Sequence, residues 1–535
     1  MEFTRKTIFD PIRKIWKGPK ESQIYDRDAS FGQIVYSRML TSPNNVIQIN
    51  DSEKTRFTNS EVIQMSSRIA LSLMKKGLKQ SDFVGIMAGN TSYVLPLVFG
   101  CYFAGIPFNP LDTSSNGDLI AHCWGKTKPQ VIFCDGNVYG LIEKTVEKLR
   151  LNCTIYTLNN HLDNVPNIDV FLLDKGIDEK LFVPVHISSG NQTAYVLCSS
   201  GSTGLSKLVC VSHRKIRLDD VLTCEDVFLS FSTICWGTGL RDIHNSGLTG
   251  CTRLVISETF SPSKAMDLIE RYNVTATFLV PRNIALMLNC PEIETRNLKS
   301  LNCVATGGSK LPVDLRTRFQ KLIDPNCQFR VFYGISEMGV ISSTVMEGDS
   351  DSSGTLHPNL ELKLLDSNGK KLGIEEEGEI HIRCDVEWMG YYEDVDATVK
   401  VYQNGWYKTG DLGRFDNNGF IYISDRIVDV INCKGFHVSP SEIEALIVKL
   451  PEVQEVSVCG IPDVMSINLL AALVVKKERS EVSCKSIQDY VAEKMPHFKQ
   501  LPGGVYFVDS LPRTASGKVM RRFVQELAEK FYKSS

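Results

Sequence analysis

Helix-like and strand-like segments alternate along the chain as far as about residue 340, and this alternation constrains the fold more than any other feature. Apolar residues recur at helical spacing over residues 60–76, 141–149 and 263–272. Short runs rich in β-branched and aromatic residues occur at 82–87, 130–134, 194–198, 252–256, 277–280 and 327–332. Strands that alternate with helices favour parallel pairing, with the helices covering the sheet. We therefore expect an α/β fold of layered, largely parallel sheets.

The pattern changes near residue 354, where short strands without intervening helices begin. Strands are expected at 360–365 and 379–383, and turn sequences rich in Asp, Asn and Gly occur at 366–369 and 416–419. Beyond residue 426 we expect helices at 440–450 and 486–494 and strands at 453–459 and 471–476. The sequence predicts a large N-terminal domain, 1–424, that contains a small antiparallel, β-barrel-like subdomain at about 345–424. A small α+β C-terminal domain, 425–535, follows, with the boundary near 425–428.

Composition excludes several classes of protein. The 535 residues exceed what one hydrophobic core supports, and a net charge of −3 with interspersed acids and bases argues against nucleic-acid partners. The 16 cysteines are scattered without a C-x-x-C pair, which favours free thiols in a reducing compartment over disulfides or a zinc site.

One uncharged stretch, from Phe83 to Leu111, is long enough to raise the question of a membrane span. Asn, Gly and Pro residues interrupt it, so we expect a buried helix followed by a buried strand and no integral membrane segment. Near the N-terminus five basic residues resemble a mitochondrial presequence, but Glu2 and Asp10 argue against one. The last residues do not form the S-K-L peroxisomal address, so we expect a cytoplasmic protein.

A segment dense in Ser, Thr and Gly follows the expected strand at 194–198 and closes on Lys207. Glycines let a backbone approach a polyphosphate, hydroxyls donate to its oxygens, and a lysine neutralises its charge. Two residues separate Gly204 from Lys207, so the segment does not fit G-x-x-x-x-G-K-[ST], and it does not fit G-x-G-x-x-G either. These residues alone leave two readings open, a phosphate-binding loop and a flexible surface connection.

The run YVLCSSGSTGLSKLVCVSH resembles the phosphate loop of the adenylate-forming superfamily, which holds acyl-CoA synthetases, insect luciferases and peptide-synthetase adenylation domains. The resemblance continues in order over nearly the whole chain. Within the superfamily, the chain resembles insect luciferase-like acyl-CoA synthetases and coumarate-CoA-ligase-like enzymes. It is carried by Tyr333-Gly334-Ile335-Ser336-Glu337, Trp406-Tyr407-Lys408-Thr409-Gly410-Asp411, Asp425-Arg426 with residues 434–444, and Leu511-Pro512-Arg513-Thr514-Ala515-Ser516-Gly517-Lys518.

The resemblance implies that ATP, magnesium and coenzyme A take part in the reaction, and that the C-terminal domain is mobile. Glu337 would hold magnesium, an ion that prefers oxygen ligands, and Lys518 would bridge the acid's carboxylate and the α-phosphate during adenylation. The catalytic residues would be Lys518, Lys207, Ser336 and Glu337. The β- and γ-phosphates would be wrapped by Ser199, Ser200, Gly201, Ser202, Thr203, Gly204 and Lys207.

The rest of the nucleotide and the thiol are assigned by the same resemblance. Tyr333, beside Gly334, would stack on adenine, and a carboxylate with a guanidinium would bind the ribose hydroxyls. The glycine at 435 would let the backbone approach the pantetheine arm of coenzyme A. The remaining residues are Gly307, Gly308 and Ser309 opposite Tyr333, and Asp411 and Arg426 at the ribose.

Four positions depart from the superfamily's usual residues. Ser206 and Leu208 replace a proline and a glycine of the phosphate loop, so we expect a less rigid loop with added bulk beside the phosphates. Val428 occupies the expected hinge position, and Asn432 stands where coumarate ligases and beetle luciferases carry lysine. The usual histidine-bearing motif of the acid pocket is replaced by residues 231–237, whose aromatic side chains either gate the pocket or belong to the core.

The preferred interpretation is an AMP-forming acyl-CoA ligase that acts on a fatty or aromatic carboxylic acid. Two alternatives stay open: an oxygenase that acts on its own adenylate, as luciferases do, and a catalytically weakened adenylate-binding protein. We expect a monomer or a weak homo-oligomer. The sequence does not identify the acid or the physiological role.

Overall fold

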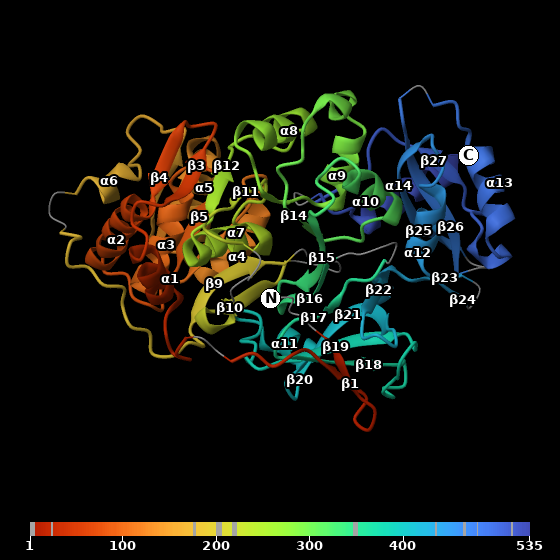
Figure 1. Cartoon of the computed structure of the whole chain (residues 1–535), viewed down its shortest axis with the longest axis horizontal. Helices are drawn as coiled ribbons and strands as arrows, with labels where there is room; N and C mark the ends of the chain where they lie inside the picture. The colour runs from red at the N-terminus through yellow and green to blue at the C-terminus, as the bar shows by residue number, and fades with distance from the viewer. Residues whose placement is uncertain are drawn as a thin grey trace.

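The computed structural model describes residues 6–22, 25–174, 178–199, 206–216, 222–345, 351–433, 436–463, 467–478, 480–514 and 517–534. Three sheets with their helices form the N-terminal part of the chain. Two smaller sheets form a C-terminal unit, which we define as residues 430–534. In Figure 1 this unit lies at one end of the molecule, and α2 and α6 lie at the other.

The first sheet has six strands in the order β10-β9-β6-β5-β7-β8. Its neighbours pair in parallel except β10, which is antiparallel to β9. The strands are β5 (Val84–Met87), β6 (Phe108–Pro110), β7 (Val131–Asp135), β8 (Thr154–Asn159), β9 (Thr193–Cys198) and β10 (Leu208–Ser212). The helices of this region are α1 (Phe31–Leu40), α2 (Asn59–Lys75), α3 (Val94–Ala104), α4 (Gly117–Thr127), α5 (Gly136–Leu149) and α6 (Asp169–Leu172).

Helix α3 is buried along its whole length, because its side chains are apolar on every face. It lies between the buried strands β5 and β6, so the uncharged stretch from Phe83 to Leu111 is part of the core, as expected. In the part of the chain that the structure describes, no helix is both long enough and apolar enough to span a bilayer.

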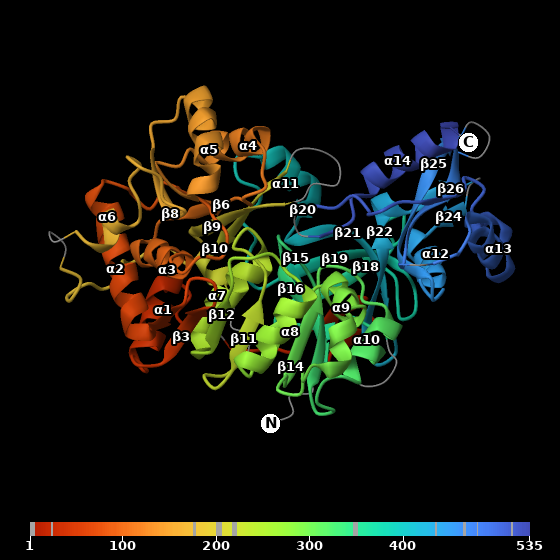
Figure 2. The ribbon, with the colours of Figure 1, turned by 90° about the horizontal axis from the view of Figure 1, so that it is seen from above.

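The second sheet has nine strands in the order β17-β16-β15-β14-β13-β11-β12-β3-β4. Its six central strands are parallel, and β4, β16 and β17 add antiparallel edges. The strands are β3 (Val46–Asn50), β4 (Thr55–Thr58), β11 (Val227–Ser230), β12 (Thr252–Val255), β13 (Ala276–Phe278), β14 (Cys303–Gly307), β15 (Gln328–Ile335), β16 (Gly339–Val345) and β17 (Thr355–Leu356). Its helices are α7 (Gly237–Thr249), α8 (Pro262–Arg271), α9 (Pro281–Leu288) and α10 (Val313–Gln320). Figure 2 shows α7 between the second sheet and the first sheet.

The third sheet is antiparallel throughout and corresponds to the expected small β subdomain. Among the described strand pairs it is open, with β1 at one edge and β20 and β22 at the other, so no pair closes it into a barrel. The N-terminal hairpin β1–β2 joins it through β18. Its elements are β1 (Ile8–Asp10), β2 (Ile15–Lys17), β18 (Leu360–Leu365), β19 (Gly378–Cys384), α11 (Val395–Val401), β20 (Tyr402–Gln403), β21 (Trp406–Phe415) and β22 (Ile421–Arg426).

The C-terminal unit has its own hydrophobic core, built on a three-stranded sheet with the order β25-β26-β27. A separate hairpin, β23–β24, contacts this sheet through β23. The elements are β23 (Ile431–Cys433), β24 (Phe436–Val438), α12 (Pro440–Ile447), β25 (Val453–Asp463), β26 (Ile467–Lys476), α13 (Cys484–Lys494), β27 (Val505–Phe507) and α14 (Arg521–Ser534).

The mixed α/β fold agrees with the sequence prediction, and the differences lie at the ends of elements. The strand expected at 277–280 ends at Phe278, because Val280 caps α9 and Pro281 is the first residue of that helix. The helix expected at 440–450 ends at Ile447, with Val448 as its C-cap. The short turn of residues 427–429 follows β22, where the domain boundary is predicted.

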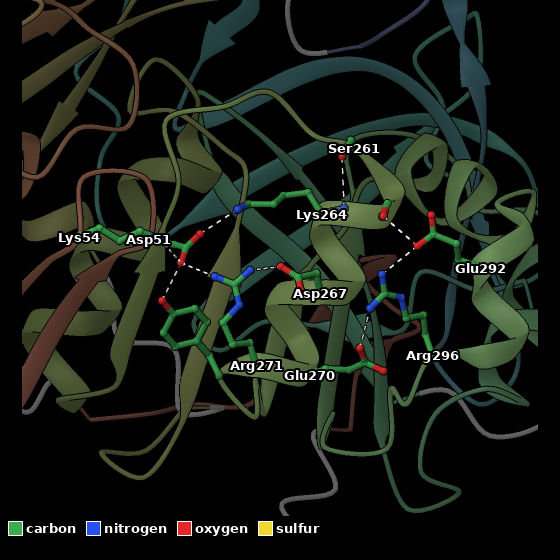
Figure 3. A network of polar contacts seen from close by, with 11 residues as sticks. Asp51, Lys54, Ser261, Lys264, Asp267, Glu270, Arg271, Glu292 and Arg296 are labelled. Carbon is green, nitrogen blue, oxygen red and sulfur yellow. Dashed lines mark hydrogen bonds and ion pairs between the residues drawn. The ribbon is translucent and has the colours of Figure 1, made fainter.

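A polar network fixes α8 to the end of β3 (Figure 3). The carboxylate of Asp51 is almost fully buried and accepts hydrogen bonds from Lys54, Lys264, Arg271 and Tyr272 at 2.7 to 3.1 Å. Burial opposes ionisation, but the hydrogen bonds from Lys264, Tyr272 and Lys54 outweigh it and hold the pKa of Asp51 well below its usual range. The carboxylate therefore stays charged and ties two elements of the second sheet together.

Candidate functional site

The carboxyl ends of parallel strands from both large sheets open onto one cleft of about 1900 Å³. Such ends are the usual place for ligands in α/β folds. β9 leads to Ser199, β14 to Gly308 and β15 to Glu337, and all three residues line the cleft. The C-terminal unit supplies the facing wall, which includes Lys518. Most of the sequence-predicted site residues are thereby brought together between the two parts of the chain.

Asp411 is bound on both sides by residues that the motifs predict. It stands opposite Arg426 in the β21–β22 pair, and the Arg426 Nε lies 3.2 Å from its Oδ1. The Tyr333 hydroxyl donates to Oδ2 at 2.6 Å. Burial raises the pKa of Asp411, while Arg426 and Tyr333 act in the opposite direction. A carboxylate has lone pairs beyond these two contacts, so Asp411 can accept further hydrogen bonds in the cleft.

Glu337 is held by three residues from other parts of the chain. Its Oε1 accepts a hydrogen bond from the Tyr391 hydroxyl at 2.8 Å, and Tyr391 Oη lies 3.2 Å from Tyr407 Oη. The Lys215 ammonium donates to the Glu337 backbone carbonyl at 2.6 Å. Burial, and next the charge of Glu337, raise the pKa of both tyrosines, so both hydroxyls stay protonated as donors. This fixes the carboxylate at the turn between β15 and β16, beside Ser336.

Lys207 lies on the other side of Tyr391. Its ammonium is 4.9 Å from the centre of the Tyr391 ring, within the range of a cation–π contact. The backbone N–H of Ser199 donates to the Lys207 carbonyl at 2.8 Å, which joins the two ends of the predicted phosphate loop. His122 Nε2 donates to the Ser206 carbonyl at 2.8 Å. The loop positions between them, Ser200, Gly201, Ser202, Thr203 and Gly204, lie outside the described residues, as does Gly435.

The segment Gly307-Gly308-Ser309 follows β14 along the same cleft. Gly308 has φ +86°, a left-handed conformation that glycine adopts without strain, and a Cβ built at Gly308 would meet no atom within 4 Å. The backbone at Gly308 is therefore bordered by open space on the side where a side chain would stand. At Gly334 a Cβ would approach the Gly339 carbonyl to 2.6 Å, so a side chain there would force the β15–β16 turn apart.

Lys518 enters the cleft on a short turn of the C-terminal unit. The turn closes through Thr514, whose N–H donates to the Lys518 carbonyl at 2.8 Å. Arg513 anchors it by donating to the Gly517 carbonyl and to Glu455. Desolvation by the surrounding protein lowers the pKa of Lys518, which is itself an exposed residue, and Arg426 acts in the same direction, while Asp429 and Asp411 raise it. The lysine of the C-terminal unit thus shares its surroundings with the carboxylate and guanidinium of the N-terminal part.

Comparisons with known proteins identify the family of the chain. The model of the AMP-binding enzyme family matches residues 37–392, and that of the AMP-binding enzyme C-terminal domain matches residues 442–518. The chain belongs to the AMP-binding enzyme family. The resemblance to the adenylate-forming superfamily is therefore confirmed.

Two related proteins and one solved structure illustrate what the chain is similar to. It is 30% identical to the luciferin 4-monooxygenase of Photuris pensylvanica, over 90% of this chain and 91% of that protein. It is 25% identical to the probable 4-coumarate–CoA ligase 1 of Dictyostelium discoideum, over 92% of this chain and 94% of that one. The crystal structure of ATP-bound MatB from Rhodopseudomonas palustris shares the fold, with a TM-score of 0.84 at 23% identity, covering 94% of this chain and 100% of that one.

One departure from the family motifs has a different effect from the one that the sequence suggested. Leu208 is the first residue of β10, and its side chain is buried in an apolar cluster with Val196 and Cys210. It therefore points into the core and adds no bulk beside the phosphates, so the expected steric effect on ATP is wrong.

The structure also describes two further departures from the family motifs, Val428 and the segment 231–237. Val428 is 59% exposed, so little of its side chain is buried against the neighbouring β subdomain. In the acid-pocket segment, Phe231 and Trp236 both line the cleft, and Phe231 packs edge-on against Phe260 with ring centres 5.0 Å apart. Both aromatic side chains therefore belong to the cleft wall.

The sequence analysis missed several residues of the site. Tyr391, Lys215 and Tyr407 contact Glu337 from distant segments. His122, also distant, donates to the Ser206 carbonyl next to the phosphate loop. Tyr407 lies inside a motif that the sequence analysis quoted, so its position was a usable signal. The others stand in no motif, and only the tertiary structure brings them to Glu337 and the phosphate loop.

Proposed function

We propose that this member of the AMP-binding enzyme family is an AMP-forming acyl-CoA ligase. It would convert a carboxylic acid and ATP to an acyl-adenylate and pyrophosphate, and then transfer the acyl group to the thiol of coenzyme A. The observation that carries the proposal is the meeting of Lys518, from the C-terminal unit, with Asp411 and Arg426 in one cleft.

The adenylation step requires positive charge where the α-phosphoryl group becomes more negative. Lys518 is a cation supplied by the C-terminal unit, and Lys207 is a second cation, supplied by the N-terminal part. Ser336 adds a hydroxyl beside Glu337. Asp411 and Arg426 suit the hydroxyls of a ribose, because one accepts and the other donates hydrogen bonds. These residues support a site that orients the acid's carboxylate toward an α-phosphate.

Magnesium fits this donor set. In the described part of the chain, no group of three or more His, Cys, Asp or Glu side chains could hold a metal ion alone. Magnesium is commonly held by one or two carboxylates together with phosphate oxygens and water. Glu337, with one oxygen already positioned by Tyr391, is the carboxylate that we assign to it. When bound, the ion would neutralise phosphate charge.

The thiol step needs a different face of the C-terminal unit. We propose that rotation about residues 427–429 withdraws Lys518 and brings Gly435 toward the pantetheine arm. The exposure of Val428 is compatible with a pivot there. A thiol of the coenzyme A type has a pKa near about 8.5, so some thiolate is present at ordinary pH without a dedicated base.

A second candidate is a luciferase-like oxygenase, favoured by the 30% identity to the Photuris enzyme. Asn432 argues against it. Asparagine has no charge and cannot assist removal of a proton from the α-carbon of the adenylate, which the lysine of luciferases at this position could do. We therefore rank it below the ligase.

The test is a panel of fatty and aromatic acids assayed with ATP and magnesium, with and without coenzyme A. Acid-dependent pyrophosphate release, followed by acyl-CoA formation only when coenzyme A is present, supports the ligase. Oxygen uptake or light with beetle luciferin would favour the oxygenase. ATP binding without pyrophosphate release for any acid would favour the weakened adenylate-binding protein.

A further inference from the structure

One face of α7 forms an inner wall of the cleft. Gly237, Arg241 and His244 are four and three residues apart, so they share one side of the helix. All three line the cleft. Seven residues of α-helix rise about 10 Å, so His244 lies deep, well inward from Trp236 at the N-terminal end of α7. Figure 2 shows α7 beside β9 and β10, which supply the facing wall.

The facing wall is mostly apolar at this depth. Tyr195 and Leu197 of β9 and Val211 of β10 line the cleft, and the ring centres of Tyr195 and His244 are 5.9 Å apart. Tyr195 precedes Ser199 by four residues of extended chain, a length of about 13 Å. His244 therefore marks the end of the cleft that is remote from the phosphate loop, where the hydrocarbon part of an acid would lie.

A buried tyrosine fixes the protonation of the His244 ring. The Tyr102 hydroxyl lies 2.7 Å from His244 Nε2, and within the described residues it has no other hydrogen-bond partner. Burial raises the pKa of Tyr102 far above its usual value and lowers that of His244 to about 3. The phenol therefore keeps its proton. Because Tyr102 is fully buried and its hydroxyl has no other acceptor among the described residues, the hydroxyl donates a hydrogen bond to Nε2. A neutral imidazole whose Nε2 accepts must carry its own proton on Nδ1.

The resulting Nδ1–H is a donor without a partner among the residues that the structure describes. His244 is only 5% exposed, yet it lines the cleft. A polar hydrogen in such surroundings is unfavourable unless something accepts it. A hydrocarbon chain cannot accept a hydrogen bond, whereas a carbonyl, ether or hydroxyl oxygen can.

We propose that His244, oriented by Tyr102, is a specificity-determining residue that recognises an oxygen acceptor at the far end of the acid. The substrate class is then a carboxylic acid with a remote oxygen function, in place of an unsubstituted fatty acid. This inference rests on the proposed function, since it assigns the deep end of the cleft to the acid. Tyr102 acts as a positioning residue, because it touches His244 and not the substrate.

The experiment compares matched pairs of acids on the full-length protein. Straight-chain acids of six to twelve carbons are paired with their 5- to 11-oxo counterparts, each with the oxygen on the penultimate carbon. Binding of each acid without ATP is measured by calorimetry, and pyrophosphate release is measured separately with ATP and magnesium. The variants are His244→Phe, which keeps an aromatic ring without the donor, and Tyr102→Phe. His161→Phe is the control, because His161 is exposed and does not line the cleft.

For the wild type we expect one chain length at which the oxo acid is preferred by about five- to tenfold, the value of one hydrogen bond. His244→Phe should reduce that ratio to about one, Tyr102→Phe should lower it by releasing the ring, and His161→Phe should retain it. Far-ultraviolet circular dichroism and melting temperature identify a variant that has not folded. If His244→Phe does not fold, His244→Gln replaces it. Because glutamine keeps an N–H donor, His244→Gln should retain part of the preference for the oxo acid.

Equal binding of both members of every pair by the wild type would overturn the inference. A preference that persists undiminished in His244→Phe would also overturn it. Failure of the proposed function is a different result: the acids bind, with or without the preference, but none supports pyrophosphate release.

Discussion

The hydroxyl of Tyr391 donates to Glu337 at 2.8 Å while its ring lies 4.9 Å from the ammonium of Lys207. One side chain thus holds the carboxylate that we assign to magnesium and the lysine that we assign to phosphate. The two contacts use different atoms, the hydroxyl and the ring face, so substitution separates them.

Tyr391→Phe removes the hydroxyl and keeps the ring over Lys207. Loss of a group that orients a metal ligand commonly costs 10- to 100-fold in metal affinity, so we expect a higher magnesium concentration for half-maximal adenylation and little change in the KM for ATP. Tyr391→Leu removes both contacts and should raise both values. Pyrophosphate release at varied magnesium and ATP measures the two effects, and a Tyr391→Phe protein with the wild-type magnesium requirement would contradict the assignment.

Leu208→Gly tests the corrected position of Leu208. Because the side chain is buried in the core of the first sheet, we expect the substitution to destabilise the protein by about 2–5 kcal/mol and not to strengthen ATP binding. The control is His122→Ala, which removes the hydrogen bond to the Ser206 carbonyl and should weaken ATP binding with a smaller loss of stability. Melting temperatures measure the loss of stability in both variants, and ATP titrations measure their affinity for ATP. Tighter ATP binding by Leu208→Gly would restore the steric interpretation.

Asp51→Asn is expected to lower stability by about 1.5–3 kcal/mol at neutral pH, because it removes charged hydrogen bonds from a buried carboxylate. The folded pKa of Asp51 lies below its unfolded value of about 3.9. The stabilisation is therefore fully present above about pH 4 and is lost as the pH falls through the folded pKa. The melting-temperature gap between wild type and Asp51→Asn should narrow below about pH 4, and a constant gap would refute this. Asp267→Asn, at the exposed edge of the network, should change stability by less than about 1 kcal/mol.

Val428→Asp tests the hinge. Valine favours extended backbone and is stiff at χ1, so we expect it to slow the change between the two orientations of the C-terminal unit. The aspartate variant should raise steady-state turnover without changing the rate of isolated adenylation. Single-turnover and steady-state rates of pyrophosphate and acyl-CoA formation provide the comparison. Unchanged turnover, or an equal change in the adenylation rate, would contradict the assignment of Val428 as the pivot.

The residues that sequence analysis could find are those that short motifs contain. Tyr333, Asp411 and Arg426 meet in the cleft as their motifs imply, and helical periodicity placed α2 to within a residue of its observed ends. A strand end was missed where a helix cap decided it, because the strand expected to reach Val280 ends at Phe278. The pairing of β2 with β18 was not predictable, because antiparallel partners so distant in sequence leave no local pattern.

The supporting contacts could not be predicted for the same reason. Tyr391 lies 54 residues from Glu337, and Tyr102 lies 142 residues from His244. A tyrosine in a strand or an apolar helix is ordinarily a core residue, and nothing in its neighbours distinguishes one that donates to a functional side chain. Leu208 shows the converse, since a motif position suggested contact with phosphate while the strand's alternation directs the side chain into the core.

Lys518 is the residue on which the proposed chemistry most depends, and Lys518→Ala with the two half-reactions measured separately is its most direct test. We expect adenylation to fall by about 10²- to 10³-fold, as for loss of one contact that stabilises charge in a transition state. Transfer from chemically prepared acyl-AMP to coenzyme A should continue at a rate close to that of the wild type. An equal loss of both half-reactions, or undiminished adenylation, would contradict the role of Lys518 as the cation that the C-terminal unit brings to the first step.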